Sequence, residues 1–358
     1  MFQRALITLL LVACGGKDSG DPSDTASTQA AGPQGPTAEL AELSDGECPD
    51  MSGTSTFSSG GERRKVRIVT PKDVTADMPV IFSFHGLTEA GTNPIDLVAD
   101  GFDLKGLANE LGAVFVVPEA RELELPGFGA LLLWGILDDA DADLALYDDL
   151  RTCLSRDLDV DLTRVHAWGH SGGALWTSVL AIERADTLAS FVEFSGGAEI
   201  TIPLLGGPYI RYATQARIPP GLLVTGGAND VWPDTTFTMI DFEAATDILQ
   251  SNLVDDGATV VRCGHDLGHF TFPQEHWLLG IDWMATHTFT GASPWAGGMT
   301  CPTGARCSER RGTGALARPT GPADQPAPWV HLVRIGESMN SNRADAAAAR
   351  PMVPNTSP

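Results

Sequence analysis

The stretch from Ala167 to Ala174, AWGHSGGA, places a Gly-x-Ser-x-Gly pattern between two apolar segments. Residues 164–168 predict a short buried strand before it, and residues 173–183 predict an apolar helix after it. A serine at such a turn has a cramped backbone and an exposed hydroxyl, and the flanking glycines let neighbouring backbone pass without a Cβ clash. The alternative is an ordinary Gly/Ser turn, but the flanking strand and helix favour a nucleophile elbow at Ser171.

Short apolar runs of strand length alternate with segments of helical periodicity along most of the chain. This alternation is typical of an α/β protein, with a mostly parallel, doubly wound sheet and helices on both faces. Strands are expected at 64–70 (an edge strand), 78–84, 113–118, 164–168, 189–194, 221–225 and 259–263 (the last strand), and helices at 102–111, 141–157, 173–183, 237–253 and 274–289.

Two residues suited to acid–base chemistry follow predicted strands downstream of Ser171. Asp230 comes after a Gly-Gly turn, and His269 comes 39 residues later. The order Ser, Asp, His, each after its own strand, is that of a catalytic triad in the α/β-hydrolase fold. We therefore expect Ser171 to be the nucleophile, His269 the general base and Asp230 the acid that orients the imidazole. Competing residues lie nearby in the sequence: Asp234 and Asp241 for the acid, and His265 for the base.

The strand predicted at 78–84 ends in Phe84-His85-Gly86-Leu87. At this position α/β-hydrolases place one donor of the oxyanion hole, and the residue after the nucleophile supplies the other. We therefore expect the backbone N–H groups of Leu87 and Gly172 to form the hole, while the His85 side chain shapes the loop. Segment 119–136 is expected to rim the pocket or to form an ordinary loop. Candidate pocket residues, for which core packing is the alternative, are His85, Trp134, His170, Trp176, Tyr209, Tyr212 and Trp232.

The charge of the chain excludes some partners. Its 358 residues carry a formal net charge of −23, which argues against nucleic acid or an anionic membrane surface as a partner. The hydrophobic content of 43% is sufficient for a globular core. No cysteine or histidine spacing predicts zinc. The aspartates within 138–143 and 157–161 lack the glycine and glutamate of a calcium loop, so we expect solvated acids and no metal site.

The N-terminal segment predicts export. Residues 1–13 combine an early arginine with an apolar run too short to span a bilayer, which is typical of a signal peptide. Leu11-Val12-Ala13-Cys14-Gly15 resembles the lipobox of bacterial lipoproteins, and the resemblance implies cleavage before Cys14 and a lipid thioether on its sulfur. We therefore expect an exported protein of the bacterial cell envelope, facing the periplasm or the cell surface. Only the anchor on Cys14 would hold it to a membrane.

Composition divides the rest of the chain into three parts. Residues 14–47 are expected to be a disordered tether, residues 48–292 the catalytic domain, and residues 293–358 a low-complexity tail without a site.

The cysteine count bears on the tail. With Cys14 lipidated, five cysteines remain, so at least one stays unpaired. Cys301 and Cys307 are near enough in sequence to close a small loop, and a small binding module stapled by that pair is the alternative to a disordered tail. The partners of Cys48, Cys153 and Cys263 are left open.

The motifs together resemble a known family. The runs 143–150 (DLALYDDL), 161–165 (DLTRV) and 169–173 (GHSGG) are similar to those of secreted polyhydroxybutyrate depolymerases and feruloyl or acetylxylan esterase-like hydrolases. Phe84-His85-Gly86, the turn before Asp230 and Gly268-His269 fit the same pattern, so the resemblance covers 64–287. It implies hydrolysis of a polyhydroxyalkanoate, feruloyl or acetyl ester, polymeric or small, through an acyl-enzyme without metal or organic cofactor.

The chain also departs from that family. Members often have Trp-Pro after the catalytic histidine, where this chain has Phe270-Thr271-Phe272-Pro273, and often Asn or Met beside the nucleophile. The acyl and alcohol groups are therefore left open. Because fold does not determine function, a serine peptidase or acyl-peptide hydrolase, a non-catalytic polymer-binding lipoprotein and a structural surface lipoprotein are the alternatives. The presence of all three triad residues favours catalysis.

Overall fold

The computed structural model describes residues 36, 39–125, 129–137, 140–203, 205–297 and 306–311. Contacts divide the chain into two units, Met1–Gly314 and Ala315–Pro358, and all described residues belong to the first. The predicted signal peptide, Cys14, most of the predicted tether and most of the predicted tail lie outside the described residues. Within the described part, no helix has both the length and the apolar character needed to cross a membrane.

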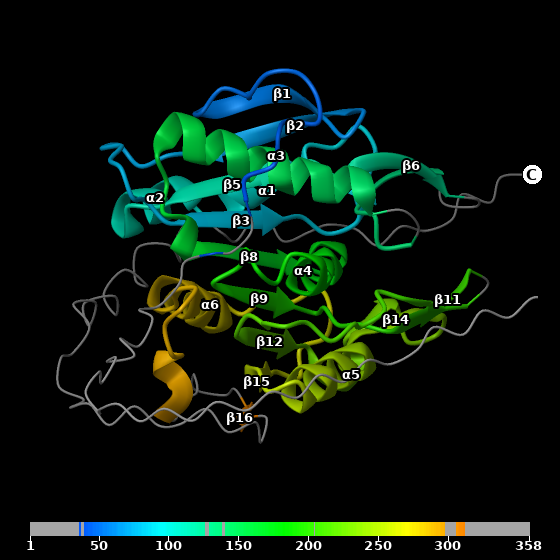
Figure 1. The fold of residues 1–358 in the computed structure, drawn as a ribbon. Coiled ribbons are helices and arrows are strands. Elements are labelled where there is room, and N and C mark those ends of the chain that lie inside the picture. The colour runs from blue at the N-terminus through cyan, green and yellow to red at the C-terminus, as the bar shows by residue number, and fades with distance from the viewer. Residues whose placement is uncertain are drawn as a thin grey trace, which may run out of the picture. The chain divides into compact units, whose positions relative to one another are not determined.

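One sheet of nine described strands runs through the first unit (Figure 1). In the order in which they lie, the strands are β1 (Gly53–Ser59), β2 (Glu62–Val69), β5 (Val114–Pro118), β3 (Val80–Phe84), β8 (Val165–His170), β9 (Ser190–Phe194), β12 (Gly221–Thr225), β15 (Thr259–Gly264) and β16 (Arg306–Arg311). The six strands from β5 to β15 are parallel. Every residue of β3, β5, β9 and β12 is buried, which explains why these strands are mostly apolar.

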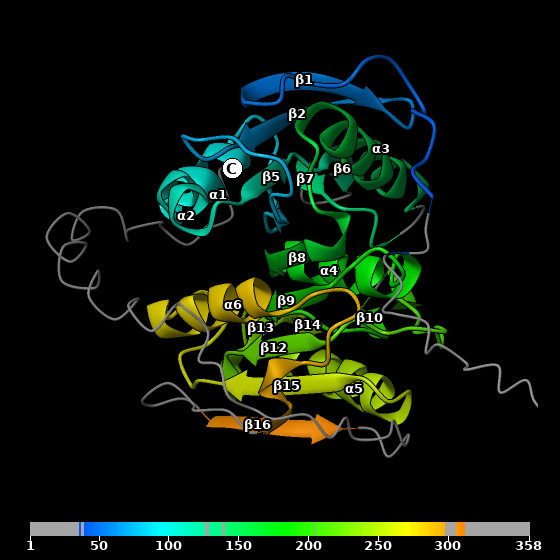
Figure 2. The ribbon, with the colours of Figure 1, turned by 60° about the vertical axis from the view of Figure 1, so that its left-hand side comes forward.

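Helices cover both faces of this sheet (Figures 1 and 2). One face carries α3 (Asp141–Leu158), α4 (Gly172–Glu183) and α5 (Phe242–Asp255), and the other carries α1 (Pro94–Gly101), α2 (Leu104–Leu111) and α6 (Gln274–Thr286). Each face has its own core: Leu150, Leu175 and Leu249 belong to the first, and Ile95 and Trp283 to the second. The predicted α/β fold, doubly wound with helices on both faces, is confirmed.

The edges of the sheet differ from the prediction. The strand expected at the edge, β2, is paired on both sides, because the Ser- and Thr-rich β1 adds an outer strand. The strand expected to be last, β15, is followed by the antiparallel β16. The predicted domain end at residue 292 is therefore too early, since Arg306–Arg311 belong to the sheet.

Short β-elements lie beyond the carboxyl ends of the parallel strands (Figure 1). They are a three-stranded sheet of β4 (Thr88–Glu89), β7 (Gly129–Leu133) and β6 (Arg121–Leu125), and the pairs β10–β11 (Ile200–Ile202, Gly206–Tyr209) and β13–β14 (Val231–Pro233, Thr238–Asp241). The helix expected from residue 237 begins only at Phe242, because Asp241 caps it and the preceding residues form β14.

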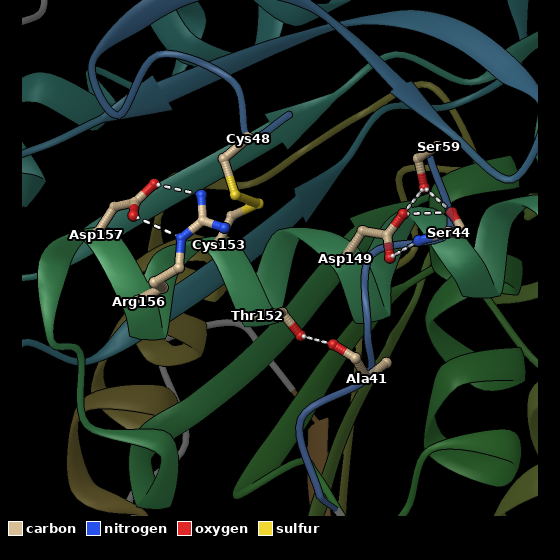
Figure 3. Close-up of a disulfide and its surroundings, with 9 residues drawn as sticks. All are labelled: Ala41, Ser44, Cys48, Ser59, Asp149, Thr152, Cys153, Arg156 and Asp157. Atoms are coloured by element: carbon tan, nitrogen blue, oxygen red, sulfur yellow. Dashed lines mark hydrogen bonds and ion pairs between the residues drawn. A yellow bond between two sulfur atoms is a disulfide. The ribbon is translucent and has the colours of Figure 1, made fainter. Parts of the chain in front are cut away.

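Among the described cysteines, two disulfides join peripheral segments to the central elements. Cys48–Cys153 joins the N-terminal segment to α3 (Figure 3), and Cys263–Cys307 joins β15 to β16. The alternative of a Cys301–Cys307 loop is therefore excluded, because the antiparallel register places Cys307 opposite Cys263; Cys301 itself lies outside the described residues.

The folded part also begins earlier than the predicted Cys48. Asp149 of α3 accepts hydrogen bonds from the amide and hydroxyl of Ser44 and from the hydroxyl of Ser59 (Figure 3). Thr152 donates to the Ala41 carbonyl, and Leu43 packs against the core. The end of the predicted tether is therefore bound to α3.

Candidate active site

Ser171 occupies the turn between β8 and α4 with φ 57° and ψ −124°, a backbone conformation that residues with a Cβ rarely adopt. The neighbouring glycines make this turn possible. A Cβ at Gly169 would lie 2.3 Å from the carbonyl carbon of Gly173, and a Cβ at Gly173 would lie 2.1 Å from the Phe84 oxygen. The Ser171 amide donates to the Phe194 carbonyl at 3.0 Å. The pattern thus forms a strained elbow held by β3 and β9.

The structure brings Ser171, His269 and Asp230 together. His269 Nε2 lies 2.9 Å from Ser171 Oγ, and His269 Nδ1 lies 2.8 Å from Asp230 Oδ1. His269 and Asp230 are 3% and 0% exposed. Burial by itself would raise the pKa of Asp230, but hydrogen bonds from His269 and the Gly226 amide hold that pKa below its usual range. An ionised Asp230 therefore accepts a hydrogen bond from His269 Nδ1–H, which leaves Nε2 unprotonated and able to take the proton of the Ser171 hydroxyl.

The competing residues are engaged elsewhere. His265 Nδ1 accepts from the Leu267 amide, and its ring contacts His276. Asp234 accepts hydrogen bonds within its own turn, from Thr236 and from the Phe237 amide. Asp241 caps α5. The hydrogen bonds of the described residues therefore single out Asp230 and His269 as the partners of Ser171.

The amides of Leu87 and Gly172 lie next to each other beside the elbow. A Cβ at Gly172 would lie 3.0 Å from the Leu87 nitrogen, and a Cβ at Gly86 would lie 3.3 Å from the Ser171 Cβ. Neither amide donates to an acceptor among the described residues. The positive end of α4 adds to the field there. These two donors are placed to bind an anionic oxygen formed next to Ser171 Oγ.

His85 holds the Leu87 loop and does not line the cavity beside Ser171. Its Nε2 accepts from the Ala120 amide at 2.9 Å, so its Nδ1 donates to the Gly86 carbonyl at 2.7 Å. Burial lowers the pKa of His85 to about 4, which keeps the ring neutral. The His85 carbonyl accepts from Trp134 Nε1 at 2.9 Å. The loop-shaping role agrees with the expectation, whereas a place for His85 in the substrate pocket does not.

Several other pocket candidates belong to the core or to peripheral contacts. Trp134 and Trp176 stack on each other at 5.9 Å between ring centroids, and both are buried. The Tyr209 hydroxyl donates a hydrogen bond to the Leu205 carbonyl. The Tyr212 hydroxyl donates one to the carboxylate of Asp256, at the end of α5. His170 is half-buried, and its ring stacks on the His269 imidazole. Trp232 lines the cavity beside Ser171, as expected, whereas the other aromatic candidates do not.

That cavity has a volume of about 410 Å³ and opens beside Ser171. Its walls are mostly aliphatic or aromatic and come from the loop after β3, from β7 and the loop after it, from the β10–β11 and β13–β14 pairs, and from the starts of α4 and α5. The expectation that segment 119–136 rims the pocket agrees with this lining. The lining residues are Leu87, Leu133, Ile136, Leu137, Ser171, Gly172, Leu175, Ile202, Pro203, Leu205, Trp232, Phe237, Met239, Ile240 and Phe242. Sequence reasoning missed most of them, because an aliphatic residue in a loop carries no chemical signature.

The acidic clusters do not form a metal centre in the described part of the chain, where no group of three or more His, Cys, Asp or Glu residues is placed to hold an ion. Asp161 caps a short 3₁₀ turn (Leu162–Arg164). Asp143 is not a solvated acid as expected. It is buried, pairs with Arg64 and accepts from the Gly135 amide at 2.6 Å, so it fixes the loop that carries Ile136.

No protein-family model matches this chain, and no curated protein matches it. Among solved structures, native sOPH is similar at 20% identity and a TM-score of 0.60, over 77% of this chain and 99% of that one. Native pOPH is similar at 21% identity and a TM-score of 0.58, over 76% of this chain and 99% of that one. An S-formylglutathione hydrolase from Agrobacterium tumefaciens is a weaker match, at 15% identity and a TM-score of 0.48, over 65% and 91% of the two chains. The likeness to the two OPH structures, together with the elbow, shows that the chain has the α/β-hydrolase fold.

Proposed function

We propose that this protein is a serine esterase that hydrolyses carboxylic esters through an acyl-enzyme. The observation that carries the proposal is the hydrogen-bonded chain Ser171–His269–Asp230 beside two amides with no acceptor among the described residues. Ser171 Oγ attacks the ester carbonyl carbon while His269 Nε2 takes the hydroxyl proton. Asp230 stabilises the imidazolium that forms.

The remaining steps follow from the same geometry. The N–H groups of Leu87 and Gly172 stabilise the tetrahedral oxyanion, each worth on the order of 3 kcal/mol of barrier. His269 then gives its proton to the leaving alcohol oxygen, and the acyl group stays on Ser171. A water molecule, deprotonated by His269, attacks the acyl-enzyme and releases the carboxylic acid and free Ser171.

The lining of the cavity favours an esterase over a serine peptidase of the same fold. An exopeptidase recognises the charged terminus of a peptide and needs an opposite charge near the nucleophile. Among the lining residues there is no Asp, Glu, Lys, Arg or His. The family resemblance supports ester substrates, either small or derived from a polymer. pOPH was also crystallised as a serine-to-alanine variant in complex with pNPB.

The proposal includes export with a lipid anchor on Cys14. The disulfides Cys48–Cys153 and Cys263–Cys307 support export, because disulfides form and persist in oxidising compartments such as the bacterial periplasm and cell surface. The anchor itself rests on the resemblance of residues 11–15 to a lipobox. Metabolic labelling with a fatty acid tests the anchor: label should appear in the wild type and disappear in Cys14→Ser. Equal labelling of both proteins would exclude the anchor.

The catalytic proposal is tested with p-nitrophenyl butyrate and the full chain. Wild type should release a burst of p-nitrophenolate and turn over, whereas Ser171→Ala should do neither while keeping its circular dichroism spectrum. Ser251→Ala, at an exposed serine of α5 whose hydroxyl donates to the Asp247 carbonyl, is the matched control and should keep full activity. Equal activity in Ser171→Ala and wild type would exclude the mechanism.

A further inference from the structure

We infer that the cavity beside Ser171 binds the acyl part of the ester, and that it selects uncharged aliphatic acyl chains of medium length. The inference rests on the proposed esterase function and adds the substrate class to it. Four properties of the cavity carry the argument: its position relative to the triad, the chemistry of its walls, its mouth and its volume.

The position assigns the cavity to the acyl group. Ser171 and both oxyanion donors, Leu87 and Gly172, line it, whereas His269 does not. The Phe242 ring lies between the His269 imidazole and the cavity: it stacks on the imidazole at 4.3 Å between ring centroids and also lines the cavity. Because the leaving alcohol takes its proton from His269 Nε2, the alcohol leaves on the imidazole side. The other substituent of the carbonyl carbon is the acyl chain, and the cavity receives it.

The wall chemistry selects an apolar chain. Apart from the Ser171 hydroxyl and the indole of Trp232, the lining side chains carry no hydrogen-bonding group. A carboxylate, a hydroxyl or a phenol buried there would lose water without gaining a partner. Charged acyl groups, 3-hydroxyacyl groups and feruloyl groups are therefore disfavoured, while each methylene of an aliphatic chain gains from burial.

The inner wall is well defined and the mouth is apolar. Leu175, Ile202 and Met239 are buried in the wall, whereas Leu205 and Phe237 remain 45% and 50% exposed at the opening. Large apolar side chains left open at a cavity mouth are typical of a binding site for an apolar ligand. The end of a longer chain would cover them.

The volume sets the length. About 410 Å³ is open beside Ser171, and a methylene group takes about the space of a water molecule, roughly 30 Å³. An incompletely filled cavity of this size holds an acyl chain of roughly six to twelve carbons. An acetyl group would leave most of the apolar wall without contact. Acetate is therefore expected to be a poor substrate.

The first test is a series of p-nitrophenyl esters from acetate to hexadecanoate, measured with the full chain. We expect kcat/KM to rise about threefold per added methylene, reach a maximum near octanoate to decanoate, and then fall. The p-nitrophenyl monoester of adipic acid, which has the length of the hexanoate ester with a terminal carboxylate, should react at least about 100-fold more slowly than the hexanoate.

Matched isoleucine-to-tryptophan variants, one in the cavity wall and one on the surface, test whether the wall sets the chain-length preference. A third variant places a charge in the wall. Ile240→Trp, in the wall, should lower the octanoate-to-acetate ratio of kcat/KM at least about tenfold. Ile248→Trp, on the exposed side of α5 and outside the lining, should leave that ratio unchanged. Leu137→Arg, at a half-buried wall position, should reverse the preference between the adipate monoester and the hexanoate.

The outcomes distinguish the two proposals. If no ester gives a Ser171-dependent burst, the esterase function itself is excluded. If acetate gives the burst but kcat/KM stays flat or falls with chain length, the esterase stands and the acyl pocket is wrong. Identical profiles of Ile240→Trp and Ile248→Trp, with no reversal in Leu137→Arg, would also overturn the pocket.

Discussion

The Nε2 atom of His170 lies 3.0 Å from the backbone carbonyl oxygen of His269. Burial, and then the neighbouring His269, lower the pKa of His170 to about 4, so its ring is neutral at pH 7 and Nε2–H donates to that carbonyl. The two imidazole rings also stack at 5.1 Å. The residue directly before the nucleophile thus holds the loop that carries the base.

Removing this contact should lower the turnover number. His170→Ala is expected to reduce kcat about tenfold with little change in KM, because this part-buried hydrogen bond contributes about 1 to 1.5 kcal/mol to the position of His269. His170→Gln keeps a donor at similar reach and should restore part of the loss. Steady-state kinetics on p-nitrophenyl butyrate measure both. An unchanged kcat in His170→Ala would show that the loop holds without His170.

Asp230 and Asp234 provide a matched pair of substitutions. Asp230→Asn should lower kcat by a factor on the order of 10⁴. The amide neither stabilises the imidazolium nor holds the neutral imidazole in the tautomer with its proton on Nδ1. Asp234→Asn, at an exposed turn, should leave kcat unchanged. Both variants can be compared with the same ester and protein concentration. A loss of less than tenfold in Asp230→Asn would remove Asp230 from the mechanism.

Glu193 of β9 should make stability depend on pH. Burial raises the pKa of its carboxyl group to about 8, although Ser178 donates to it at 2.6 Å. Between pH 4.5 and 8, the carboxyl group of Glu193 is therefore protonated in the native protein but ionised in the unfolded chain. Its contribution to stability is present in full below pH 4.5 and is lost as the pH rises through 8, a change of up to about 5 kcal/mol.

Glu193→Gln keeps the shape without the ionisation. The stability of the variant minus that of wild type should therefore be larger at pH 9 than at pH 5. Urea unfolding midpoints of both proteins at the two pH values measure this difference. Glu183→Gln, at the exposed end of α4, should give the same difference from wild type at both. If the Glu193→Gln difference does not grow with pH, Glu193 ionises freely in the native state.

The disulfides should stabilise the fold to different extents. Cys48–Cys153 closes a segment with a sequence separation of 105 and Cys263–Cys307 one of 44. In the chain-entropy treatment, the first therefore stabilises by about 0.8 kcal/mol more than the second. Double serine variants at each pair should lower the urea midpoint, with the larger loss for Cys48/Cys153. A larger loss for Cys263/Cys307 would show that contacts of β16 outweigh the chain entropy.

The sequence by itself determined the elbow, the central sheet and the order of the triad. The elbow was visible because glycine and serine are required by local backbone geometry, as the close approach of Gly169 to Gly173 shows. The parallel strands were visible because burial on both faces leaves uninterrupted apolar runs. Asp230 and His269 followed from their places after two of these strands.

Tertiary structure decided the rest. His269 rather than His265 meets Ser171 because of loop positions that no local pattern encodes. The polar edge strands β1 and β16 have no apolar period of their own, and their long-range pairing also sets the disulfide between Cys263 and Cys307. The cavity is assembled from aliphatic residues of separate loops. Such contacts form between segments far apart in sequence, so their energy belongs to the packing of the folded chain and is not visible in any one segment.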